Sequence, residues 1–130
     1  MSTNQSESPF DRIFELGTPL DGATEPVITL THLILEEAIH AGVERIHMST
    51  VGSVQWSVRA EWHEVMKVPL FASTRVINRI KIMANLQLSK RAQHGTVHVR
   101  LNERVFHWPV RTSPGADGNE EVILDCQLTR

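Results

Sequence analysis

Seven histidines and one cysteine are the side chains in this sequence best suited to metal binding or nucleophilic attack. If Asn102 and Glu103 form a two-residue turn, His98 lies opposite His107 on neighbouring strands, with Cβ atoms about 5 Å apart. Two imidazoles at that distance, helped by His94, have the chemistry to share a metal ion. The sequence places no carboxylate or thiolate beside them. We therefore interpret them as an exposed polar pair and predict no metal site.

The sequence lacks the other common catalytic patterns. Cys126 lies in an apolar alternating segment, which predicts a buried and inert thiol, and a single cysteine excludes an internal disulfide. A phosphate-cradling P-loop needs a glycine followed by lysine, and none of the seven glycines is followed by lysine. No paired acids or serine-centred elbow are present. We therefore expect no catalytic residue and no cofactor.

The basic residues are unevenly distributed. The chain of 130 residues has 13 basic and 15 acidic side chains, a net charge of −2. Residues 65–102 nevertheless contain seven basic side chains and no acidic one: Lys67, Arg75, Arg79, Lys81, Lys90, Arg91 and Arg100. Such a block indicates an acidic partner, a nucleic acid, or an acidic surface of the same chain. The negative net charge disfavours nucleic acid.

Periodicity predicts two helices. In residues 26–41 the apolar side chains recur every three or four positions, Pro26 suits the first helical turn, and Gly42 suits the end. A second helix is expected over 71–85, with Arg75, Arg79 and Lys81 outside its apolar stripe. Strands are expected at 43–48, 54–58, 62–68, 96–101, 104–110 and 121–128. The aromatic residues expected to anchor the core are Trp56, Trp62, Trp108, Phe71 and Phe106.

This order of elements favours an α+β fold, with an antiparallel sheet of five to six strands and two main helices packed on one face. Residues 1–9 are polar and serine-rich, which is typical of a disordered tail, and 10–25 are expected to connect it to a single domain at 26–130. No apolar run approaches the ~20 residues that span a bilayer, and the polar start does not look like a secretory signal. We expect no membrane insertion and a cytoplasmic location.

Several stretches resemble one known family. Residues 26–40 and 43–48 resemble the helix and following SDIHIEP signature of type II secretion and type IV pilus assembly ATPases. Residues 79–86 resemble their RIKVMAGLDI helix, 93–95 their QDG turn, and 114–124 their closing strand. The resemblance covers residues 26–128. It implies the PAS-like N-terminal domain that precedes the ATP-hydrolysing domain in those proteins, here without the ATPase domain.

The sequence departs from that family where the family has charged residues. One strand of the family carries two arginines followed by an Asp-Gly turn. At the corresponding positions this sequence has Gln55 and Ser57, and then Arg59-Ala60. His94 stands where the family's QDG turn has its aspartate. In the family those arginines reach toward nucleotide, because a guanidinium fork suits phosphate. Glutamine and serine lack that charge. The comparison therefore implies no ATP hydrolysis, no tight nucleotide binding, and a protein that is not an enzyme.

The first functional hypothesis is a stand-alone interaction or regulatory module that docks on a secretion or pilus ATPase, or on an associated assembly component. Its expected contact surface comprises Arg75, Arg79, Lys81, Lys90 and Arg91. The alternatives are a PAS-like small-molecule sensor, a nucleic-acid-binding module that uses the cationic block, and a piece of a longer ATPase. Because the family's hexamers are built largely by the ATPase domain, we expect a monomer or homodimer.

Overall fold

The computed structural model describes residues 12–17 and 25–126, and, within them, every side chain except that of Asp117. It contains two α-helices, α1 (Pro26–Ala41) and α2 (Leu70–Met83), and a short 3-10 helix at Ala116–Gly118. Its strands are β1 (Ile13–Glu15), β2 (Arg45–Ser49), β3 (Ser53–Val58), β4 (Glu61–Lys67), β5 (Gln93–Leu101), β6 (Arg104–Pro114) and β7 (Glu120–Asp125). The predicted disordered tail, residues 1–9, lies outside the described residues.

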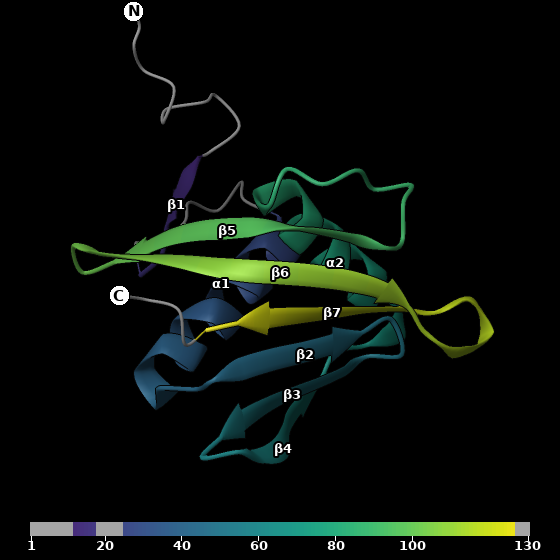
Figure 1. Ribbon diagram of the computed structural model, residues 1–130, viewed down its shortest axis with the longest axis horizontal. Coiled ribbons are helices and arrows are strands. Elements are labelled where there is room, and N and C mark those ends of the chain that lie inside the picture. The colour runs from purple at the N-terminus through teal and green to yellow at the C-terminus, as the bar shows by residue number, and fades with distance from the viewer. Residues whose placement is uncertain (1–11, 18–24, 127–130) are drawn as a thin grey trace, which may run out of the picture.

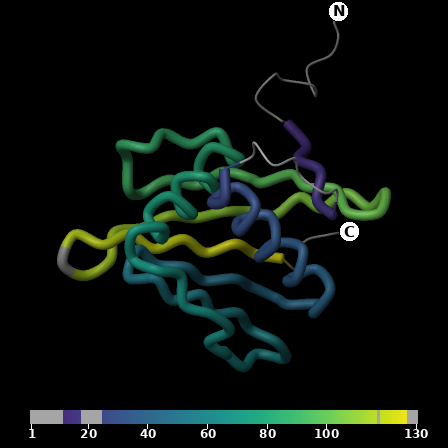
Figure 2. The backbone as a smooth tube through the Cα atoms, turned by 180° about the vertical axis from the view of Figure 1, so that it is seen from behind, coloured from purple at the N-terminus to yellow at the C-terminus, as the bar shows by residue number. Residues whose placement is uncertain are grey.

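The strands form one sheet in the order β1-β5-β6-β7-β2-β3-β4. Both helices lie on one face of this sheet, behind it in Figure 1 and in front of it in Figure 2. The other face is not covered by either helix. The α+β class and the two helices on one face are therefore as the sequence predicted.

The sheet has seven strands rather than the five to six predicted. The additional strand, β1, lies in residues 10–25, which were expected to be a connector. It pairs in parallel with β5, with Phe14 opposite Val99, and every other pair is antiparallel. A three-residue strand has too short an alternation to be recognised in sequence, and it forms because β5 offers its free edge.

The β5–β6 hairpin has the predicted register. Leu101 pairs with Arg104 and His98 with His107, which makes Asn102-Glu103 a two-residue turn. Both turn residues have positive φ angles, 52° and 71°, as the primed hairpin turns require. Local turn chemistry therefore specified which side chains face each other across these strands.

The core lies between the helices and the sheet. Its largest fully buried side chains include Trp108 from β6, Leu35 from α1, and Ile77 and Ile80 from α2. Helix α1 spans the predicted residues and ends at Gly42 in the left-handed conformation, φ 64°. Helix α2 begins one residue before its predicted start and ends two residues before its predicted end.

Two of the aromatic residues expected in the core lie at the surface instead. Trp62 on β4 is 46% exposed, and Phe71 in the first turn of α2 is 80% exposed. Strand β4 is at the edge of the sheet, so one of its sides has no neighbouring strand. Phe71 lies about one residue's rotation, roughly 100°, away from the buried stripe that starts at Ala72. Side-chain size alone was thus a poor guide to burial at these positions.

Candidate functional site

The five basic residues predicted to form a contact surface do not share one environment. Arg75 is exposed and Arg79 is half-buried, one turn apart on α2. Lys90 and Arg91 are exposed in the segment between α2 and β5. Lys81 is fully buried, with 0% exposure. The prediction that Lys81 belongs to an exposed surface is therefore wrong.

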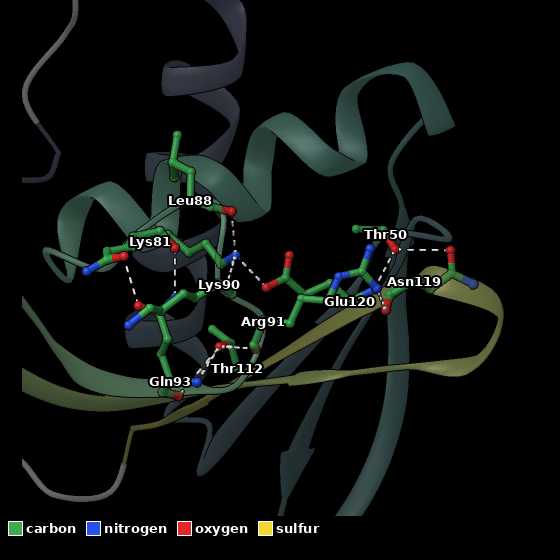
Figure 3. A network of polar contacts seen from close by, with 10 residues as sticks. Thr50, Lys81, Leu88, Lys90, Arg91, Gln93, Thr112, Asn119 and Glu120 are labelled. Carbon is green, nitrogen blue, oxygen red and sulfur yellow. Dashed lines mark hydrogen bonds and ion pairs between the residues drawn. The ribbon is translucent and has the colours of Figure 1, made fainter.

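Lys81 is buried because its ammonium group has partners inside the fold. Its Nζ lies 2.5 Å from Oε2 of Glu120 at the start of β7, and it donates to the carbonyl oxygens of Lys90 at 2.8 Å and Leu88 at 3.3 Å. Figure 3 shows these contacts converging on the Lys81 ammonium group. A buried charge requires such pairing, since an unpaired ammonium group in the interior is strongly unfavourable.

The same network fixes the backbone that carries Lys90 and Arg91. The side-chain amide of Gln93 donates to the carbonyl of Lys90 at 3.0 Å, and the hydroxyl of Thr112 donates to the carbonyl of Arg91 at 2.5 Å (Figure 3). The guanidinium of Arg91 donates to the carbonyl of Asn119 at 3.4 Å. Lys81 therefore positions this basic segment from within and does not contribute to its surface.

Arg79 contacts a cluster from two other elements. Its Nη2 lies 3.3 Å from Nε2 of His32 on α1, and its guanidinium packs 5.1 Å from the centre of the Phe14 ring on β1. The guanidinium of Arg12 contacts the same ring at 4.8 Å. Because arginine remains protonated, the imidazole of His32 accepts the hydrogen bond. Arg12, the residue before β1, thus adds a third arginine beside Arg75 and Arg79, which sequence analysis did not include.

Among the described residues, this cluster carries positive charge that no carboxylate balances. Burial lowers the pKa of His32, and the charge of Arg79 lowers it further. Burial lowers the pKa of Arg79, and the charge of Arg12 adds to that effect. None of Arg12, Arg75 and Arg79 has a carboxylate partner among the described residues, and the buried Nε of Arg79 has no hydrogen-bond partner.

Apolar side chains lie on the same side of α2 as the two arginines. Positions four, eight and eleven residues after Phe71 lie on the same helical stripe as Phe71. They are occupied by Arg75, Arg79 and Ile82. Ile82 is 51% exposed, and Leu70 beside Phe71 is 70% exposed. We call these four stripe residues together with Leu70 the α2 stripe. Aromatic residues and arginine are the residue types enriched at the centres of protein interfaces.

The alternative chemistries receive less support from the geometry. The Nδ1 atoms of His98 and His107 lie 2.7 Å apart, so the two imidazoles pair as predicted. Residues 12–17 and 25–126 contain no cluster of three or more histidine, cysteine, aspartate or glutamate side chains that would hold a metal ion. Cys126 is buried, as the sequence predicted, and its burial and the charge of Asp125 raise the pKa of its thiol. Across the described part of the chain, neither helix has the length and apolar character needed to cross a membrane.

Comparison with known proteins identifies the family. The family described as "Type II/IV secretion system protein" matches residues 21–127, which include every helix and all strands except β1. The chain belongs to this family, as its motifs indicated.

Individual relatives come from secretion and pilus systems. The type II secretion system ATPase E of Vibrio cholerae is 30% identical over 112 residues, which are 81% of this chain and 22% of the relative. The type IV pilus assembly ATPase PilB of Myxococcus xanthus is 30% identical over 70% of this chain and 17% of the relative. The chain therefore spans about a fifth of the length of these ATPases.

A solved structure supports the same fold. The ATPase DotB of Legionella pneumophila aligns with 89% of this chain and 33% of its own, with a TM-score of 0.59 and 14% sequence identity. At that identity the likeness concerns the fold alone.

Proposed function

We propose that this chain is a PAS-like, non-catalytic docking module that binds a secretion or pilus assembly ATPase, or a component assembled with it, in the cytoplasm. The α2 stripe is its contact surface. One observation carries the proposal: in the described part of the chain, an exposed aromatic side chain lies one helical turn from an unpaired arginine. Phe71 is 80% exposed, and Arg75 has no carboxylate partner among the described residues. Family membership supplies the class of partner.

The charge of the surface determines the chemistry of the partner. Arg12, Arg75 and Arg79 present positive charge without a carboxylate from the described part of this chain, so an acidic surface is the complement. Rim charges such as that of Arg75 orient and accelerate encounter, whereas a desolvated aromatic such as Phe71 contributes to the lifetime of the complex. A phosphate-binding P-loop needs a glycine followed by lysine, and the sequence has no such pair. This supports a non-catalytic role.

The direct test measures binding of the purified chain to the purified ATPase of its host by biolayer interferometry. Phe71→Ser should weaken binding about tenfold, mainly through faster dissociation. Arg75→Glu should slow association and reduce its dependence on salt. Arg111→Glu, an exposed charge reversal on β6, is the matched control and should bind like the wild type.

The outcomes separate the competing functions. If neither Phe71→Ser nor Arg75→Glu changes binding, the α2 stripe is not the contact surface. If the purified chain shows ATP turnover that follows the folded protein through repurification, the non-catalytic assignment is wrong. Binding to nucleic acid with a steep salt dependence would assign the basic block to a different partner.

A further inference from the structure

The outer edge of strand β4 has no neighbour among the described residues. Strand β4 takes the last position in the sheet, as Figure 1 shows. It is seven residues long, and all of them except Met66 are exposed. An edge strand leaves a row of backbone N–H and C=O groups unpaired, and natural proteins usually keep such edges short or covered. This edge therefore has the backbone groups that a further strand needs.

An apolar groove lies beside this edge. It has a volume of about 170 Å³ and lies between α1 and the two outer strands of the sheet. Apart from Glu37, the residues that line it are apolar: Leu33, Ile34, Val54, Trp56, Val65 and Met66. Leu33 is 46% exposed and Val65 is 36% exposed, so the groove is open to solvent. A cavity of about 150 Å³ holds a benzene ring, so this groove has room for one large apolar side chain.

A bulge in β4 enlarges the apolar wall of the groove. Val54 pairs with Met66, whereas the next residue of β3 pairs with Glu64, so Val65 is an extra residue in β4. In a regular strand, two consecutive side chains point to opposite faces. Because of the bulge, Val65 and Met66 both line the groove. The local irregularity of the strand thus places more apolar surface at the edge of the sheet.

The charged residues at the groove are acidic. Glu37 lines it, and Glu61 pairs with Val58, which shares its face of β3 with the groove residues. The carboxylate of Glu37 lies 3.9 Å from the imidazole of His40. That of Glu61 lies 3.9 Å from the imidazole of His63. Exposed pairs at this distance contribute little, so a basic occupant is the electrostatic complement of this side of the edge.

A second copy of the chain complements this edge less well. The other carboxylate of β4, that of Glu64, lies 3.9 Å from the ammonium group of Lys67. Two β4 strands paired antiparallel about their middle residue would place two copies of Glu64 directly opposite each other. Like charges in that position are destabilising. A basic segment of another protein brings no such repulsion.

We propose that β4 and the groove bind an extended, basic segment of a partner protein. The segment adds a strand to the outer edge of β4 and inserts one large apolar side chain between Leu33 and Val65. Side chains two positions from this anchor lie on the same face of the added strand, so basic residues there reach Glu37 and Glu61. The surface shares no residue with the α2 stripe, so it stands independently of the docking function.

The test is an NMR titration of the full ¹⁵N-labelled chain with the peptide Ac-Thr-Lys-Thr-Phe-Thr-Lys-Thr-NH₂. It should saturably shift the amide resonances of β4 and the indole N–H resonance of Trp56, and it should slow hydrogen exchange at the outward-pointing amides of β4. The indole resonance of Trp108, in the core, should stay in place. A matched peptide with alanine in place of phenylalanine should bind about tenfold more weakly. A second matched peptide, with glutamate in place of both lysines, should bind more weakly still.

Variants of the chain test the same surface from the other side. Leu33→Ser should weaken binding of the phenylalanine peptide about tenfold. Glu37→Lys should weaken it and reduce its dependence on salt. Leu88→Ser is the matched control, because Leu88 is 49% exposed and lies outside the groove, and it should keep the wild-type affinity. Arg75→Glu, on the α2 stripe, should also leave this affinity unchanged.

Each contrary result overturns part or all of the proposal. No saturable shift in β4 with the phenylalanine peptide would exclude strand addition. Equal affinity of the alanine peptide would exclude the groove as the anchor site, and equal affinity of the glutamate peptide would exclude recognition of a basic segment. If ultracentrifugation of the chain alone shows a dimer that Leu33→Ser dissociates, a second copy is the occupant and the proposal is wrong. The matched peptides give their answer on the unchanged protein, whatever the variants do to folding.

Discussion

The ammonium group of Lys81 lies 2.5 Å from the carboxylate of Glu120, where the side chain of Lys81 is fully buried and that of Glu120 is 12% exposed. This ion pair joins the last turn of α2 to the first residue of β7. With the two carbonyl groups that Lys81 also contacts, it holds the segment between α2 and β5 in place. A residue expected to meet a partner is instead part of the protein's interior.

Replacing Lys81 should strongly destabilise the fold. In Lys81→Met the carboxylate of Glu120 and the carbonyl of Lys90 lose their partner, and breaking one side of a buried pair costs about 3–5 kcal/mol. Urea denaturation should show that loss in the free energy of unfolding. Lys67→Met is the matched control, because Lys67 lies 3.9 Å from Glu64 in an exposed pair, for which about 0–1 kcal/mol is typical. Equal losses in the two variants would contradict this account of Lys81.

His32 should make the protein less stable in acid. Its pKa is lowered in the folded state from the ordinary value of 6.5, by burial first and by Arg79 second. The unfolded chain therefore binds more protons below that pH, and the free energy of unfolding falls as the pH falls through 6.5. Denaturation between about pH 7 and about pH 5 should show a shallower decline in His32→Gln. Thr29→Gln, at an exposed position of the same helix that carries no titratable group, is the control and should keep the wild-type slope.

The contribution of Arg79 to this effect is separately measurable. Arg79→Gln removes the neighbouring positive charge and should raise the pKa of His32 toward its ordinary value. An NMR titration of the His32 imidazole measures the change. Because burial is the larger cause, the pKa should remain below 6.5 in the variant. A pKa that falls instead would contradict the placement of Arg79 beside His32.

The turn at Asn102-Glu103 offers a stabilising substitution. Glu103 adopts a φ angle of 71°, which is unfavourable for a residue with a Cβ atom and favourable for glycine. Glu103→Gly should raise the free energy of unfolding by about 0.5–1 kcal/mol, since the strain exceeds the entropy that glycine gains in the unfolded chain. Glu103→Ala keeps the strained φ while removing the charge and should give no comparable gain. Thermal unfolding of both variants checks the difference.

The thiol of Cys126 should react only when the protein unfolds. Burial and the nearby Asp125 raise its pKa, so the nucleophilic thiolate is scarce in the folded state. Labelling with iodoacetamide should be slow in buffer and should increase across the urea unfolding transition. Labelling in buffer as fast as in unfolding concentrations of urea would contradict the buried position of Cys126.

Local patterns predicted the elements that local forces specify. Helix α1 has its predicted boundaries because Pro26 suits a first turn and Gly42 adopts the left-handed φ that ends a helix. The His98–His107 pairing followed from a two-residue turn, since turn length determines the register of a hairpin. The motifs also indicated the family, which the match over residues 21–127 confirms.

Long-range packing decided the features that sequence patterns missed. Strand β1 forms only because residues far along the chain leave an edge of β5 open, as the pairing of Phe14 with Val99 shows. Phe71 is exposed despite its hydrophobicity, because no element in the described part of the chain covers its side of the first turn of α2.

The sequence by itself determined the fold class, the family, the hairpin register and the presence of a basic block. The tertiary structure decided which basic residues are exposed at the surface and which are buried. Arg75 and Lys81 lie six positions apart on one amphipathic helix, and rotation about the helix axis turns the first outward and the second inward. Whether an inward lysine is tolerated depends on a carboxylate from another element, and only folding brings Glu120 to it.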